Sequence, residues 1–171
     1  MPTNLFMKTV LNNPLFIMIT ACLVGTGISS CAGEPDCSIA GRSLLRCYIY
    51  TYNSESKTID KAALTQLTVT ALETDSVIIN AQTNVQDMSL PLRYTKETTV
   101  FVLHYNNSNE VTDTITINHR NTSYFLSLEC GYEMKQNVTN VKYTKHLLDS
   151  ISVRSNNTNV NGQENFQLFY N

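Results

Sequence analysis

The chain has 171 residues, of which 42% are hydrophobic and 15% charged, with 6 Gly, 4 Pro and 5 Cys. This length fits one ordinary globular domain and disfavours a solenoid or a large enzyme. Twelve Lys and Arg against fourteen Asp and Glu give a net charge of −2, and no basic run is present that would neutralise a series of phosphates, so nucleic acid is not an expected partner.

The N-terminal residues have the layout of a secretion signal. Residues 15–28 read LFIMITACLVGTGI, an uncharged apolar run that is too short for the roughly 20 residues needed to cross a bilayer. Lys8 is the only charge before this run, and Met7 directly before it is the expected start of the signal. We expect residues 1–30 to be removed as a signal peptide.

The four residues that end this segment, Ile28-Ser29-Ser30-Cys31, resemble the lipobox of bacterial lipoproteins. The Cys31 thiol would accept a diacylglyceryl group, and several acyl chains at about 0.8 kcal/mol per buried CH₂ would hold the protein permanently on the membrane. We therefore expect lipidation at Cys31, a tether over residues 31–37, a folded domain over 38–171, and an outer-membrane location. A plain secretion signal with an incidental cysteine is the alternative.

Three cysteines remain after the signal and the lipidated residue are set aside, in a compartment that permits disulfides. Cys47 lies in the alternating segment 44–52 and is most simply a small buried hydrophobe. Cys37 and Cys130 lie in turn-like settings, PDCS and ECGY, so we predict a disulfide between them. Three free thiols are the alternative.

The body of the chain alternates apolar and polar residues in short segments separated by turn signals. About nine such segments favour an all-β fold, an antiparallel β-sandwich of about 8–9 short strands, over a barrel. Segments 98–105, 111–119 and 123–128 are expected to form a three-strand meander, and Pro91 places its own segment at a sheet edge. The expected strands are 44–52, 67–72, 87–92, 98–105, 111–119, 123–128, 138–143, 149–154 and 164–170.

The triplet Asp, then Ser or Thr, then an aliphatic residue occurs three times, with its hydroxyl at Ser76, Thr114 and Ser150. An Asp that ends a turn before a β-branched stretch produces this pattern without further cause. The triplet also resembles the O-glycosylation sequon of exported Bacteroidota proteins, which makes these hydroxyls candidate glycan acceptors. Alternation places each hydroxyl on the strand face opposite the following aliphatic residue, which we expect to be outward.

Catalytic and metal-binding signatures are not found in the sequence. His104, His119 and His146 have no short metal-ligand spacing with Cys or acid, and there is no Gly-x-Ser-x-Gly, His-Glu-x-x-His or Gly-rich phosphate loop. His104 alternates with apolar residues and is expected to be a partly buried ring with a hydrogen-bond partner. We expect no enzymatic activity, no metal and no cofactor.

Tyr48, Tyr50 and Tyr52 are expected on one face of a strand, opposite Cys47 and Ile49. Because Tyr combines an apolar body with a polar tip, the row is a candidate binding surface for glycan or protein. Coverage by another segment is the alternative.

Six segments carry a resemblance to a known family: TVTALETDSVIIN, LPLRYTKETTVFVLHY, TDTITINH, LSLECG, HLLDSI and ENFQLFY. In this order they resemble a family of small Bacteroidota lipoproteins catalogued only as a domain of unknown function. The resemblance implies an immunoglobulin-like sandwich on a lipid anchor, with recurring cysteines that match Cys37 and Cys130. It implies no substrate.

Two functional classes follow from these expectations. One is an accessory lipoprotein that is held in the membrane by its anchor and docks on an outer-membrane β-barrel protein or envelope assembly. The other is a surface module that binds glycan. An exposed, flat sheet with tyrosines favours the first class, and a concave aromatic pocket with convergent polar groups favours the second. We expect the first.

Overall fold

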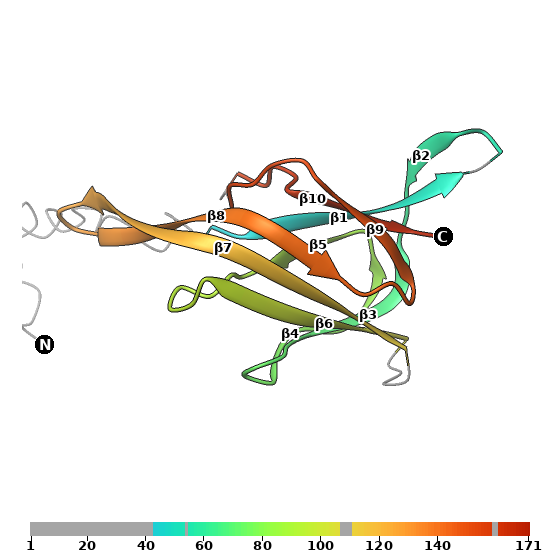
Figure 1. Ribbon diagram of the computed structural model, residues 1–171, viewed down its shortest axis with the longest axis horizontal. Helices are drawn as coiled ribbons and strands as arrows, with labels where there is room; N and C mark the ends of the chain where they lie inside the picture. Colours follow the sequence, from blue (N-terminus) through green and yellow to red (C-terminus); the bar gives the residue numbers. More distant parts are fainter. Residues whose placement is uncertain (1–42, 54, 107–110, 159–160) are drawn as a thin grey trace, which may run out of the picture. The chain divides into compact units, whose positions relative to one another are not determined.

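The described part of the chain is all-β. The computed structural model describes residues 43–53, 55–106, 111–158 and 161–171, which contain ten strands and no helix, arranged as two five-stranded sheets (Figure 1). One sheet, here the β1 sheet, contains β1 (Leu45–Asn53), β2 (Thr58–Lys61), β5 (Asp87–Leu90), β9 (Leu148–Val153) and β10 (Phe166–Tyr170). The other, the β6 sheet, contains β3 (Leu64–Ala71), β4 (Ser76–Val85), β6 (Thr98–Tyr105), β7 (Thr112–Ser127) and β8 (Gly131–Tyr143). The predicted β-sandwich is confirmed.

Strand β1 lies at the centre of its sheet. Along one side it pairs with β5 over its first half and with β2 over its second half, both antiparallel. Along the other side it runs parallel to β10, with Cys47 opposite Phe166. Two details therefore differ from the expected antiparallel sandwich of 8–9 strands, because the structure has ten strands and one parallel pair. The immunoglobulin-like type stays a prediction.

The β6 sheet is antiparallel throughout, in the order β4-β3-β6-β7-β8. The predicted meander is wrong in one respect, because segments 111–119 and 123–128 form the single 16-residue strand β7. The residues read as a turn stay extended, since Asn121 pairs with Gln136 of β8 and its side chain binds backbone carbonyls of the preceding loop. Strands β2 and β4 were not predicted.

Apolar side chains from both sheets fill the space between them. Burial alternates strictly along β6, as expected for a strand with one face turned to the core. Cys47 is fully buried with a free thiol, which confirms its predicted place, and burial raises its pKa well above the ordinary value. The largest fully buried side chains include Phe101, Phe166, Leu45, Ile49, Leu67, Leu90, Leu103, Ile115, Ile117, Leu148 and Leu168.

The predicted signal peptide (1–30) and tether (31–37) lie outside the described residues, as do Cys31 and Cys37. Every described residue belongs to one unit, Cys37–Asn171. No helix in the described ranges is both long and apolar enough to cross a membrane.

Candidate functional site

Strands β7 and β8 continue beyond the other strands of their sheet as a projecting two-stranded hairpin (Figure 1). Pairing between β7 and β6 ends at Asn118, and from there to the turn, among the residues that the structure describes, β7 has only β8 beside it in the sheet. We name residues 120–137 the arm. Backbone pairing along the arm runs to the pair Ser127 and Gly131.

The tip of the arm is a three-residue turn over 128–130. Gly131 closes it with a φ of 69°, in the left-handed region that favours glycine. The Cys130 N–H donates a 3.0 Å hydrogen bond to the Ser127 hydroxyl. The sequence ECGY is therefore a turn, as its composition indicates.

The arm carries a cluster of exposed apolar side chains. The exposed fractions are 41% for Tyr124, 53% for Phe125, 37% for Leu126, 89% for Leu128 and 75% for Tyr132. The rings of Phe125 and Tyr132 meet edge to face with centroids 5.5 Å apart, and the Tyr124 hydroxyl donates a 2.9 Å hydrogen bond to the Glu133 carboxylate. Five large apolar side chains are thus exposed on one hairpin, whereas the exposed apolar residues of most protein surfaces are scattered singly.

Sequence reasoning missed this surface because SYFLSL reads as a half-buried strand. The available signal was the run Tyr124-Phe125-Leu126, since three consecutive large apolar residues place apolar side chains on both faces of a strand. One face continues the inner face of the sandwich, and the other is the solvent face. Beyond the cover of the β1 sheet, both faces are exposed.

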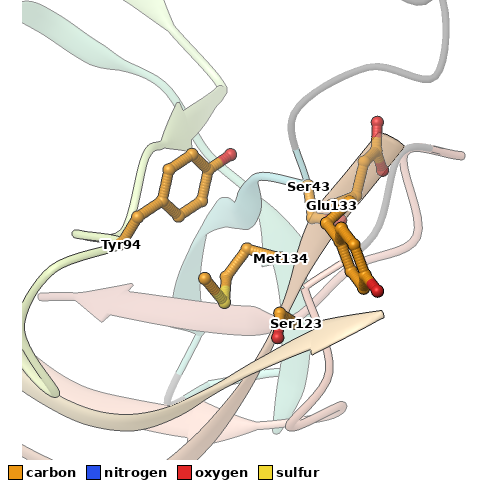
Figure 2. Close-up of a pocket in the computed structure, with 6 residues that line it drawn as sticks. Ser43, Tyr94, Ser123, Glu133 and Met134 are labelled. Carbon is orange, nitrogen blue, oxygen red and sulfur yellow. The ribbon is translucent and has the colours of Figure 1, made fainter. Parts of the chain in front are cut away.

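A pocket of about 280 Å³ lies on the inner face of the arm (Figure 2). In Figure 2 the Met134 side chain lies between Tyr94 and Ser123. The volume is just below the roughly 300 Å³ at which small-molecule sites begin, so the pocket suits a single small group. Its lining residues are Ser43, Tyr94, Ser123, Tyr132, Glu133 and Met134.

The three tyrosines of β1 lie on the strand face opposite the buried Cys47 and Ile49, but they differ in exposure. Tyr48 is half-buried, with the Lys61 ammonium 5.6 Å from its ring centroid. Tyr50 is only 9% exposed, because its ring lies 5.8 Å from that of Phe169 and its hydroxyl donates to Glu164. Tyr52 is 50% exposed. Neighbouring strands thus cover the row in part, and its use as a binding surface stays a prediction.

The three candidate glycan acceptors differ in access. Ser76 is exposed, whereas Thr114 and Ser150 are half-buried. The isoleucines that follow Thr114 and Ser150 turn toward the core, as alternation predicts. Val77 instead is 55% exposed, because it lies on the edge strand β4, whose pairing with β3 shifts register twice. Glycosylation of the three hydroxyls stays a prediction.

The Asp113 carboxylate is fully buried and accepts hydrogen bonds from three successive backbone N–H groups, His146 at 2.8 Å, Leu147 at 2.9 Å and Leu148 at 2.8 Å. The hydroxyls of Thr144 (2.8 Å) and Tyr105 (3.1 Å) also donate to it. Burial on its own raises the pKa of Asp113, yet these hydrogen bonds hold it below the ordinary value. An ionised carboxylate with its acceptor positions filled fixes the β8–β9 connection and is poorly suited to act as a base.

The side chains of His119 and His104 also have hydrogen-bond partners within the fold. His119 is buried, and burial lowers its pKa. Its Nδ1 donates to Asn121 Oδ1 at 3.0 Å and its Nε2 accepts from the Thr99 hydroxyl at 2.9 Å, so both ring nitrogens are occupied. His104 lies 3.1 Å from the Thr70 hydroxyl, which confirms the predicted hydrogen-bond partner.

No group of three or more His, Cys, Asp or Glu side chains within the described ranges is placed to hold a metal ion. Cys130 lies at the tip of the arm, and its predicted disulfide partner Cys37 lies outside these ranges. Their pairing stays a prediction.

Comparison with known proteins matches the chain to a family. No curated protein and no solved structure matches the chain. A family model described as a family of unknown function, DUF6452, matches residues 66–170, which run from within β3 to the end of β10 and include the whole arm. Since this match covers more than half of the chain, the protein belongs to the DUF6452 family of unknown function.

Proposed function

We propose that the protein is a lipid-anchored, non-catalytic module of the cell envelope that presents a surface of its β-sandwich to an outer-membrane protein. The lipobox at Cys31 supports the anchor. The observation that carries the interaction role is the placement of exposed apolar side chains on projecting hairpins, where a second protein can reach them.

The β1–β2 hairpin is the proposed site for the partner protein. It projects at the end of the sandwich opposite the arm (Figure 1), and every residue of β2 is exposed. Tyr52 and Ile59 pair across the two strands with exposed fractions of 50% and 55%. Because Tyr is enriched at interface centres, this pair is the proposed anchor for a partner's apolar surface.

The local environments of the titratable side chains support a non-catalytic role. A catalytic acid or base has a strongly perturbed pKa and faces a cleft. Among the described residues Asp113 is the buried carboxylate and His119 the buried imidazole, and groups of neighbouring strands and loops occupy the hydrogen-bonding positions of both. Each therefore has a structural explanation.

The test uses the full-length, lipidated protein in its own membranes, with partners captured after solubilisation. The double variant Tyr52→Ser with Ile59→Ser should lose a co-purifying outer-membrane protein that wild type retains. Val77→Ser is the matched control, because Val77 is equally exposed but lies on β4. Equal recovery from the double variant would exclude the β1–β2 hairpin as the docking site.

The anchor has its own test. Cys31→Ser should release the protein from the membrane fraction or leave its signal uncleaved. If this variant is processed and sediments with membranes as wild type does, the lipoprotein assignment is wrong.

A second candidate function is glycan binding in the pocket at the arm. It is favoured by Tyr94 and Tyr132 in the lining, since aromatic rings stack on sugar faces while Ser123 and Glu133 offer hydrogen-bonding groups. In a glycan-array assay, Tyr132→Ala should remove binding that Tyr52→Ala leaves intact. Equal binding by both variants would exclude the pocket.

A further inference from the structure

We propose that the tip of the arm rests on the membrane surface, with the side chains of Leu128 and Phe125 among the lipid headgroups. This inference depends on the proposed lipid anchor at Cys31. It adds a second point of contact, which sets the orientation of the sandwich relative to the bilayer.

The first argument is the place where the chain enters the described domain. Ser43, the first described residue, lines the pocket together with Ser123 and Tyr132 of the arm. Twelve residues lead from Cys31 to Ser43, and at about 3.3–3.6 Å per residue they span at most roughly 40 Å. The chain therefore enters the domain beside the arm, and the tether is short enough to keep the arm within reach of the bilayer.

The predicted disulfide between Cys37 and Cys130 would tighten this geometry. It would join the tether to the turn at the arm tip, leaving six residues between that turn and the lipidated cysteine, or roughly 20 Å of extended chain. The proposal does not require the bridge, because Ser43 already places the tether at the arm.

The second argument is the distribution of side chains along the arm. Leu128 at the tip is 89% exposed and Phe125 is 53% exposed, while Tyr124 and Tyr132 lie further from the turn or pack beside Phe125. Leu128 therefore lies at the tip, and the aromatic rings of Phe125, Tyr132 and Tyr124 lie behind it. This order matches the preference of aromatic side chains, Tyr above all, for the headgroup level. The outer edges of a two-stranded ribbon leave backbone groups unpaired, so the arm stays at headgroup depth.

The net charge of the arm favours contact with lipid, whatever the headgroup charge, over contact with a strongly charged protein. The arm carries Arg120 and Lys135 against Glu129 and Glu133, so its charges cancel. Attraction must then come from burial of apolar surface, which does not depend on anionic lipid and is insensitive to salt. In this orientation the β1–β2 hairpin, at the opposite end of the sandwich, faces away from the bilayer (Figure 1).

The experiment exploits the absence of tryptophan from the chain. Full-length lipidated Leu128→Trp is reconstituted into phosphatidylcholine vesicles in which a fraction of the headgroups carries a nitroxide, a short-range quencher of Trp emission. Its emission should shift to the blue and be largely quenched, equally with and without added anionic lipid. Phe125→Trp supplies a second probe on the arm. Tyr52→Trp, on the β1–β2 hairpin, is the matched control and should keep the emission of a water-exposed Trp.

The outcomes separate the arm contact from the anchor. Protein that floats with the vesicles while both arm probes stay unquenched overturns the arm contact and leaves the anchor standing. Equal quenching of Tyr52→Trp also overturns the arm contact, because the domain would then have no preferred orientation on the membrane. A blue shift that disappears when protein is diluted in lipid indicates contact between copies and also overturns it. Failure to float contradicts the anchor, and the arm contact falls with it.

Discussion

The hydroxyl of Tyr105 donates a 3.1 Å hydrogen bond to Oδ2 of Asp113, the oxygen that also accepts from the backbone N–H groups of Leu147 and Leu148. The Tyr105 hydroxyl lies 3.4 Å from that of Tyr170 on the last strand of the other sheet. Burial raises the pKa of Tyr105, which keeps its proton in place as a donor. One buried carboxylate thus joins β6, β7, the β8–β9 connection and, through Tyr105, the β1 sheet.

Asp113→Asn should lower the free energy of unfolding by about 3 kcal/mol, because it turns an NH₂ group toward donors that need an acceptor. Urea denaturation followed by circular dichroism measures the change. Asp149→Asn is the control, since Asp149 is exposed on β9 and should tolerate the change. An Asp113→Asn variant as stable as wild type would contradict the structural role.

The same carboxylate predicts a pH dependence. Because the pKa of Asp113 in the folded state is below its ordinary value of 3.8, its contribution is present above that pH and is lost as pH falls through the folded pKa. The stability difference between wild type and Asp113→Asn should therefore shrink as pH falls below about 3.8. If the stability difference between wild type and Asp113→Asn instead grew as pH falls, the prediction would be wrong. Other carboxylates affect both proteins alike and cancel in the comparison.

Asn121→Ala should release the β5–β6 loop. The carbonyls of Arg93 (3.0 Å), Tyr94 (2.9 Å) and Lys96 (2.8 Å) share the two hydrogens of the Asn121 amide. Its removal takes this donor from the Tyr94 and Lys96 carbonyls, while Gln136 still donates to that of Arg93. We expect a loss of about 2–3 kcal/mol and faster amide hydrogen exchange over residues 93–97. Thr122→Ala, at the exposed neighbouring position, should leave the exchange unchanged.

The Cys47 thiol should resist alkylation in the folded protein and react once the protein is unfolded. Its full burial raises its pKa and denies access to the reagent. In the unfolded protein without reductant, one thiol, that of Cys47, should react with the reagent. After reduction the thiols of Cys37 and Cys130 should react as well. Peptide mapping identifies each site. A disulfide at Cys47 would overturn both assignments.

Glycosylation, if it follows the triplet, should favour Ser76, the most exposed of the three hydroxyls. Mass spectrometry of protein from its own host should show a glycan on the Ser76 peptide, which Ser76→Ala removes. Asp75→Ala provides a second variant, because it breaks the triplet and keeps the hydroxyl. Unmodified peptides across Ser76, Thr114 and Ser150 would leave only strand chemistry as the cause of the pattern.

Strict alternation was sufficient to locate strands with one buried face. The predicted segment 98–105 coincides with β6, since each second residue from Thr99 to Tyr105 is buried. Edge strand β4 gave no such signal, because Ala81 and Asn84 adopt positive φ and interrupt the period of two. The extended backbone at 120–122 depends on contacts from Asn121 to a loop about 25 residues away, which local sequence does not encode.

The candidate site was harder to predict than the fold. The tyrosines of β1 lie on one face as predicted, but the burial of Tyr50 depends on Phe169 and Glu164, more than 100 residues distant in sequence. The exposed apolar surface of the arm could not be predicted from the sequence either. Its apolar residues look like core residues, and only the position where the β1 sheet ends leaves them exposed.

The parallel pairing of β1 with β10 has a consequence for the order of folding events in time. The central strand of its sheet is made first and its parallel neighbour last, so the sheet closes only when the C-terminal residues Phe166–Tyr170 have emerged. Pairings of such large sequence separation slow folding toward the range of milliseconds to seconds. Until then the edge of β1 that pairs with β10, from Cys47 to Thr51, stays without its backbone partner. Unpaired strand edges of this kind make partly folded chains prone to aggregation.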